Sequence, residues 1–173
     1  MHNKKKYIHN KGGFTLLETL VAISVLILAT VGPMTLASDS IRNASLSRNQ
    51  TVAYFLAEEA AEFIHNQVTS NSFSGDSWLE GFGTCLNPNG CRIDVPDNQI
   101  SGCGSSCPVL EFDEANGLYG YGGGQSVDSL FTRTIHMQEI VNDQEVQVDI
   151  IVEWEQVGGT RQAIIEDHLL NWR

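Results

Sequence analysis

A long, almost unbroken apolar run opens the hydrophobic pattern of the chain, from Phe14 to Ala37. Its one charged residue is Glu18. As an α-helix the run would extend about 36 Å, enough to cross the roughly 30 Å hydrocarbon core of a bilayer. The alternative is a cleaved signal peptide, but the apolar region of a signal peptide covers only about 7–15 residues. The pattern therefore predicts a transmembrane helix over residues 14–37.

Residues 38–68 are predicted to continue this helix in amphipathic form. The segment contains neither glycine nor proline. Its apolar residues recur at intervals of three or four positions, as on one face of a helix. Because such a face must be buried, we expect it to pack on a sheet. The residues expected on this face are Val52, Phe55, Leu56, Ala60, Phe63 and Ile64.

From residue 131 the period of the pattern changes to two, which is typical of half-buried strands. Asn142-Asp143 and Gly158-Gly159 separate three such segments, the last around Gln162–Leu170. The sequence therefore predicts an α+β fold, with the amphipathic helix packed on an antiparallel sheet of three strands within residues 131–173. The residues on the apolar face of the first two strands are Phe131, Arg133, Ile135, Met137, Val146, Val148, Ile150, Val152 and Trp154.

Residues 69–130 are predicted to form a loop-rich part of the same head, because glycine and proline are concentrated there and aliphatic periodicity is weak. Short strands are expected near Arg92–Val95 and Val109–Phe112. The segment Gly117–Gly124 is expected to be a mobile connector.

The four cysteines, Cys85, Cys91, Cys103 and Cys107, all lie in this region and allow three disulfide pairings. We favour Cys85–Cys91 and Cys103–Cys107, since each pair would close a short loop. A zinc site is the alternative, but there is no C-x2-C pair, and the predicted topology places the cysteines outside the reducing cytosol.

The distribution of charge supports that topology. All four lysines (Lys4, Lys5, Lys6 and Lys11) precede the apolar run, all 21 acidic residues follow Lys11, and the net charge is -11. Lysines before a membrane span hold the N-terminus in the cytoplasm. A nucleic-acid partner is not expected, because binding to phosphates needs lysine and arginine arranged along one face.

The border between the lysines and the apolar run has features that a simple membrane anchor does not need. Gly12-Gly13 makes the backbone accessible there, and Glu18 is a carboxylate that costs free energy in lipid unless it has a partner. If the chain were cut after Gly13, the new amine of Phe14 would lie four residues before Glu18, on the same helical face. The two charges could then pair within one subunit or between neighbouring subunits.

The segment Lys11-Gly12-Gly13-Phe14-Thr15-Leu16-Leu17-Glu18 resembles the processing site of type IV prepilins and of type II secretion pseudopilins. The resemblance implies a leader at residues 1–13, cleavage between Gly13 and Phe14 by a prepilin peptidase, and methylation of the new amine. In that family the residue matching Glu18 is needed for methylation and for assembly. Gly32-Pro33 is also similar to a helix-breaking feature of the family.

Three segments of the head, residues 54–64, 131–135 and 169–173, are similar to minor pseudopilins. The resemblance implies a pilin-like fold and a structural subunit of a filament, with other pilin or pseudopilin subunits and an inner-membrane assembly platform as partners. The subunit would cross the cytoplasmic membrane once, with its N-terminus inside, before it enters a cell-surface or periplasmic filament. The sequence leaves open whether the subunit is a major or a minor one. It also leaves open whether the filament serves secretion, adhesion, motility or DNA uptake.

Neither a cofactor nor catalysis is expected. Two groups of oxygen ligands near turns could bind calcium, but neither has the spacing of an EF-hand, so solvated acidic loops are preferred. These groups are Asp94, Asp97 and Asn98, and Asp113, Glu114 and Asn116. His136 and His168 have acids nearby, but no nucleophile with a matching base is evident, so an enzyme is not predicted. The main alternative is a single-pass membrane protein with an extracytoplasmic binding domain.

Overall fold

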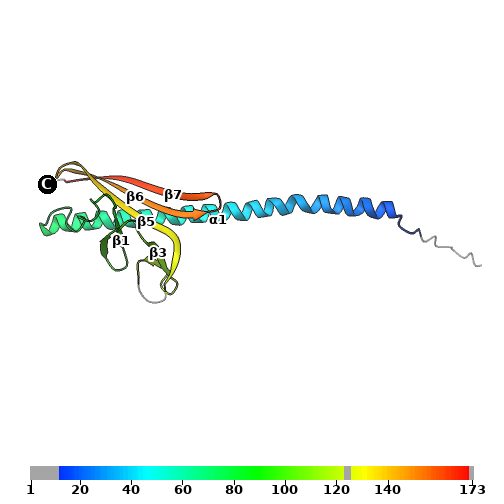
Figure 1. The fold of residues 1–173 in the computed structure, drawn as a ribbon, viewed down its shortest axis with the longest axis horizontal. Coiled ribbons are helices and arrows are strands. Elements are labelled where there is room, and N and C mark those ends of the chain that lie inside the picture. Colours follow the sequence, from blue (N-terminus) through cyan, green and yellow to red (C-terminus); the bar gives the residue numbers. More distant parts are fainter. Residues whose placement is uncertain (1–11, 123–125, 172–173) are drawn as a thin grey trace, which may run out of the picture. The chain divides into compact units, whose positions relative to one another are not determined.

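The computed structural model describes residues 12–122 and 126–171. The chain divides into two compact units, the first ending at Ser45 and the second beginning at Leu46. One helix, α1, is followed by seven strands (Figure 1). Their bounds are α1 Leu16–Ser74, β1 Cys91–Asp94, β2 Gln99–Gly102, β3 Val109–Asp113, β4 Leu118–Gly120, β5 Ser126–Val141, β6 Glu145–Gln156 and β7 Gly159–Leu170.

Helix α1 ends at Ser74, six residues beyond the predicted end at Val68. Gly75 follows with a φ of 85°, a conformation that costs glycine little. The N–H of Asp76 donates to the carbonyl of Asn71 at 3.2 Å, which is the hydrogen bond of a Schellman cap. The helix therefore stops at the first glycine after its amphipathic segment. The prediction of an end at Val68 was wrong, because weaker periodicity there does not interrupt the helix.

The sheet is antiparallel and contains seven strands, whereas three were predicted. Strands β5, β6 and β7 pair in sequence order, as expected for the three-stranded unit. The turn residue Asp143 has a positive φ of 55°, and Gly158 and Gly159 also have positive φ. On its other side β5 pairs with β1 and β3, which extend the sheet to β2 and β4.

The region predicted to be rich in loops thus contributes four short strands. Strands β1 and β3 lie where short strands were expected, but β2 and β4 were not predicted, and β5 begins at Ser126 rather than at residue 131. The prediction of a mobile connector is wrong for Leu118–Gly120, which is strand β4. Gly123 and Gly124 lie outside the described residues, as does the predicted leader except for Gly12 and Gly13.

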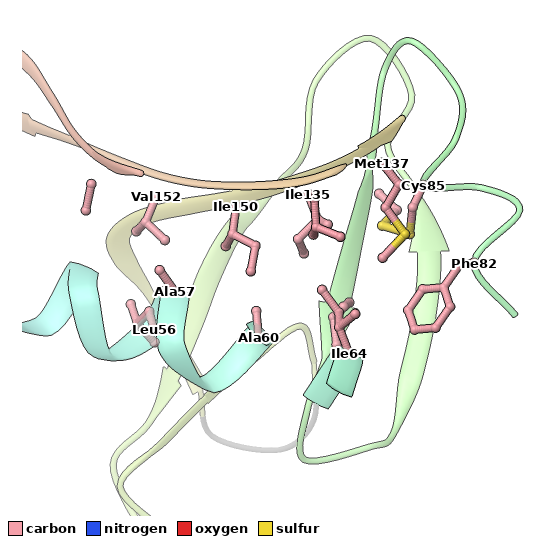
Figure 2. Close-up of a cluster of buried hydrophobic side chains, with 14 of the residues drawn as sticks. Leu56, Ala57, Ala60, Ile64, Phe82, Cys85, Ile135, Met137, Ile150 and Val152 are labelled. Carbon is pink, nitrogen blue, oxygen red and sulfur yellow. A yellow bond between two sulfur atoms is a disulfide. The ribbon is translucent and has the colours of Figure 1, made fainter. Parts of the chain in front are cut away.

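Helix α1 packs on the sheet through a face rich in alanine (Figure 2). Ile135, Ile150 and Val152 of the sheet are fully buried in the same core. The predicted alternation on β5 and β6 is confirmed, since every residue expected on the apolar face is buried. The buried apolar residues of the helix are Ala53, Leu56, Ala57, Ala60 and Ile64.

The predicted helix face was partly wrong. Phe55 is 64% exposed, and Val52 and Phe63 are only partly buried. The alanines take the central positions because their small side chains let the helix backbone approach the sheet closely. The pattern was misread because large apolar residues were given more weight than alanine.

Arg133 is the one charged residue buried in this core, among the residues described, with no exposed surface. One terminal nitrogen, Nη1, donates to the Leu56 carbonyl at 2.7 Å and to Glu59 Oε2 at 2.8 Å. The other, Nη2, donates to the Ile93 carbonyl at 2.7 Å. A single guanidinium therefore joins helix α1 and strand β1 to its own strand β5.

Tyr121 supports the same position, since its hydroxyl donates to the Arg133 carbonyl at 3.2 Å. Burial raises the pKa of the Tyr121 phenol above its ordinary value. A raised pKa in the folded state gives stability that is present below the unfolded-state pKa of about 10 and is lost as the pH rises further. We expect the urea midpoint to fall less steeply above pH about 10 in Tyr121→Phe than in the unmodified chain. Parallel pH curves for the two proteins would contradict this.

Candidate functional site

The predicted processing segment has open backbone followed at once by a helix. Gly12 and Gly13 lie outside any regular element, and α1 begins at Leu16. Space is free around both glycines, because a Cβ built on either would meet no atom within 4 Å. Phe14 is 79% exposed. The Gly13–Phe14 bond is thus accessible on the chain by itself, as a peptidase substrate must be.

Glu18 lies in the first turn of α1, where its carboxylate faces the positive end of the helix dipole. The Glu18 N–H donates to Thr15 Oγ1 at 3.3 Å, so Thr15 is the N-cap and Glu18 is the third helical residue. Threonine followed three residues later by glutamate is the sequence of a capping box. The bond from the Glu18 N–H forms the Thr15 half of such a box.

Among the residues described, α1 is the one helix that is long and apolar enough to cross a membrane, and its apolar stretch lies near the N-terminus. None of the residues in its most apolar stretch is buried within the chain. Within the described residues, no other part of the chain covers this apolar surface. The helix assignment continues through Gly32 and Pro33, the proposed helix-breaking pair.

The hydroxyl groups in this apolar segment are satisfied within the helix itself. Each donates to a backbone carbonyl three or four residues earlier, at distances between 2.8 and 3.1 Å. In an apolar environment an unsatisfied hydroxyl would be costly, and these bonds remove that cost. The donors are Thr19, Ser24, Thr30, Thr35 and Ser38.

The cysteines form the disulfides Cys85–Cys91 and Cys103–Cys107, the two pairings that the short loops favoured. No cysteine is free, so none is available to bind zinc as a thiolate. Cys85 and Cys91 are both fully buried and belong to the core. Figure 2 shows Cys85 beside Met137. This bridge fixes the loop before β1 against the sheet.

We expect the double variant Cys85→Ala/Cys91→Ala to be less stable than the unmodified chain by about 2–4 kcal/mol, from the lost loop constraint together with two small cavities. The matched control is Cys103→Ala/Cys107→Ala. It opens a similarly short loop, but Cys103 is already partly exposed in the unmodified chain. Its loss should be smaller, about 2 kcal/mol. Urea unfolding in detergent measures both, and a larger loss for the control would contradict the assignment of Cys85 and Cys91 to the core.

The two acidic groups considered as calcium ligands line one cavity of about 250 Å³. Asp94, Asp97, Asp113 and Asn116 contribute to it together with Glu111, which sequence reasoning did not select. Asn98 and Glu114 do not line it. Within residues 12–122 and 126–171, however, no three side chains of His, Cys, Asp or Glu are grouped as a metal site.

Two of the carboxylates around this cavity accept hydrogen bonds within the chain. Asp113 accepts from the Asn116 side chain at 2.7 Å and from the Ala115 N–H at 2.8 Å, and these bonds lower the pKa of its carboxyl. Asp94 Oδ2 accepts from the Tyr121 N–H at 3.0 Å. The first carboxylate therefore stabilises its own turn, and the second joins strand β1 to the segment after β4.

The histidines pair with carboxylates between elements. His65 Nε2 on α1 is 2.7 Å from Asp167 Oδ2 on β7, and His168 Nδ1 is 2.8 Å from Glu145 Oε1 on β6. His136 is close to Gly90, where a Cβ would meet its ring at 2.9 Å. The pairs of His65 and His168 lie on the surface and join the helix and strands to one another, which is a structural task.

Comparisons with protein-family models, with curated proteins and with solved structures give no match. A functional assignment therefore rests on the residues of the chain and on their geometry.

Proposed function

We propose that the chain is a structural subunit of a type IV pilus-like or type II secretion-like filament, made as a precursor and cut between Gly13 and Phe14. The observation that carries this proposal is the order of features at the N-terminus. An accessible Gly13–Phe14 bond is followed within two residues by the start of a helix, and that helix has Glu18 in its first turn and a fully exposed apolar surface.

This arrangement suits a helix that exchanges one apolar environment for another. In the precursor the apolar segment would cross the cytoplasmic membrane once, with the lysine-rich leader inside. In the filament the same surface would pack on the equivalent helices of other pilin or pseudopilin subunits. The apolar side chains and internally bonded hydroxyls suit both states, so transfer from lipid to protein needs no rearrangement of the helix.

The head agrees with a pilin-like fold, in which the C-terminal half of the long helix packs on an antiparallel sheet. Two disulfides suit a head that works outside the cytosol. The partners that follow from the proposal are a prepilin peptidase, other subunits and an inner-membrane assembly platform. The acidic head gives no reason to add a nucleic acid.

A processing variant tests the proposal in cells that contain a prepilin peptidase. We expect Gly13→Val to block cleavage, because the small residue before the bond is replaced by a branched one. The variant should remain in the membrane fraction at the size of the precursor and be absent from filaments sheared from the surface. Gly12→Ala, one residue further from the bond, is the control and should be processed. Normal processing of Gly13→Val would contradict the proposal.

The capping-box sequence of Thr15 and Glu18 favours one competing candidate, a single-pass membrane protein with an extracytoplasmic binding domain. If Glu18 serves only to cap α1 together with Thr15, its charge needs no partner subunit. That protein would keep residues 1–13 and would not assemble into filaments. Substitutions of Glu18 separate the two candidates and are considered in the Discussion.

A further inference from the structure

The sheet ends in a long strand whose outer edge has no partner strand among the described residues. Strand β7 has 12 residues, pairs within residues 12–122 and 126–171 only with β6, and keeps one continuous register along it. The other edge strands, β2 and β4, have 4 and 3 residues. Proteins usually protect an exposed edge with proline, with charged side chains (lysine above all) or with a bulge, because its free N–H and C=O groups bind other strands. Strand β7 has no proline, lysine or bulge, and its charged residues Arg161, Glu166 and Asp167 carry both signs, so they can also pair with those of a second strand.

The hydrogen bonds at the end of β7 show which backbone groups face this edge. The Asn171 N–H donates to the Gln144 carbonyl at 2.8 Å, so this position faces β6. Antiparallel pairing alternates, and the even-numbered residues therefore direct their N–H and C=O groups to the free edge. The His168 N–H agrees with this assignment, since it donates to Asp167 Oδ1 at 2.8 Å.

We propose that the free edge of β7 binds β7 of a second copy of the chain, antiparallel, with Ile164 opposite Ile164. Hydrogen-bonded registers must pair even-numbered with even-numbered residues, which leaves few choices. With Ile164 at the centre, Arg161 lies directly opposite Asp167 on both sides of the twofold axis. The neighbouring registers place Arg161 opposite Ile165 or Leu169 and lose both ion pairs, and a register centred on Glu166 sets two carboxylates against each other.

Arg161 and Asp167 are available for this pairing. Arg161 is exposed and makes no ion pair within the part of the chain that the structure describes. Asp167 uses Oδ2 for His65 and Oδ1 for the His168 N–H. In the proposed register Thr160 of the second copy lies opposite His168, and its carbonyl takes over the His168 N–H. Asp167 Oδ1 is then free to accept from Arg161 of the second copy.

The contact also covers apolar surface. Ile164, at the centre, is 46% exposed in the single chain. A twofold contact of this kind closes on itself and leaves no repeat from which a filament could grow. The inferred dimer is therefore a state of subunits outside the filament. It does not depend on the proposed function, because it follows from the edge of the head alone.

Cysteine cross-linking of the full chain in detergent micelles tests the register. The native cysteines are all in disulfides, so an added cysteine is the only free thiol. Under mild oxidation we expect Ile164→Cys to give covalent dimers on a non-reducing gel. Gln162→Cys and Glu166→Cys should each give few dimers alone but should cross-link when mixed, because residue 162 of one copy lies opposite residue 166 of the other.

Val157→Cys is the matched control for random collision, since Val157 is 79% exposed and lies in the turn between β6 and β7. Adding Arg161→Glu to Ile164→Cys should weaken dimerisation about fivefold, because two cross-strand ion pairs are lost. Adding Asp167→Arg as well should restore it. Cross-linking of Ile164→Cys no greater than that of Val157→Cys, or equal cross-linking at 162, 164 and 166 alone, would overturn the proposal.

Discussion

Replacing Arg133 by methionine is expected to destabilise the head by about 3–5 kcal/mol, much of the stability of a domain of this size. Methionine fills a similar volume but provides no donors. The carbonyls of Leu56 and Ile93 then lose hydrogen bonds in the core, and a buried acceptor without a partner costs about 1–3 kcal/mol. Urea unfolding of the full chain in detergent, followed by tryptophan fluorescence, measures the loss.

Two further variants identify the source of this loss. Glu59 is 32% exposed, so its carboxylate remains partly hydrated when the ion pair is broken. Glu59→Gln is therefore expected to cost only about 1 kcal/mol. Arg48→Ala, at an exposed arginine on α1 that lies outside the proposed dimer contact, should change stability by less than about 0.5 kcal/mol. If Glu59→Gln were as damaging as Arg133→Met, the ion pair rather than the two carbonyls would hold the core together.

Substitution of Glu18 should abolish filament assembly while leaving the chain in the membrane. In a dry helix bundle the Phe14 amine and the Glu18 carboxylate, at a separation of about 4 Å, would attract each other by about 4 kcal/mol at an effective dielectric of about 20. This energy corresponds to a change of close to a thousandfold in the equilibrium constant for assembly. Without the carboxylate, the amine would be buried unpaired. We therefore expect Glu18→Ala to be undetectable in sheared filaments, as measured by immunoblotting against the membrane fraction.

A glutamine substitution separates the charge of Glu18 from the capping role that its sequence position would allow. A glutamine at this position of a capping box can replace glutamate but carries no charge. The filament account predicts that Glu18→Gln fails to assemble, as Glu18→Ala does. Thr15→Ala is the matched control, since it removes the cap, at a cost of about 1 kcal/mol, and keeps the carboxylate. Assembly of Glu18→Gln together with failure of Thr15→Ala would show that Glu18 acts only as a cap.

The elements with strong local periodicity were predicted well from the sequence. Strands β5 to β7 and their two turns follow from alternation and from the residues between them. The start of β5 at Ser126 did not, because the polar Ser129 and the exposed apolar Leu130 break the alternation that begins at Phe131. Strands β2 and β4 were missed because their pairing partners, rather than their own patterns, define them.

Long-range contacts set the limit of the sequence analysis. Arg133 was expected on the apolar face of β5, but its acceptors are 77 and 40 residues away in the chain and no pattern connects them. Similarly, the two acidic groups were assigned separately, and the pairing of both β1 and β3 with β5 brings them to one cavity. The candidate processing site was predicted because all its residues are consecutive.

The central claim is that the Gly13–Phe14 bond is cut and that the subunit begins at Phe14. Mass spectrometry of the intact chain, purified from membranes of cells that contain a prepilin peptidase, tests it most directly. The account predicts a mature chain of residues 14–173 with a methyl group on the Phe14 amine. A chain that still begins at Met1 would contradict it, and one that begins near Ser38 would identify the apolar run as a cleaved signal peptide.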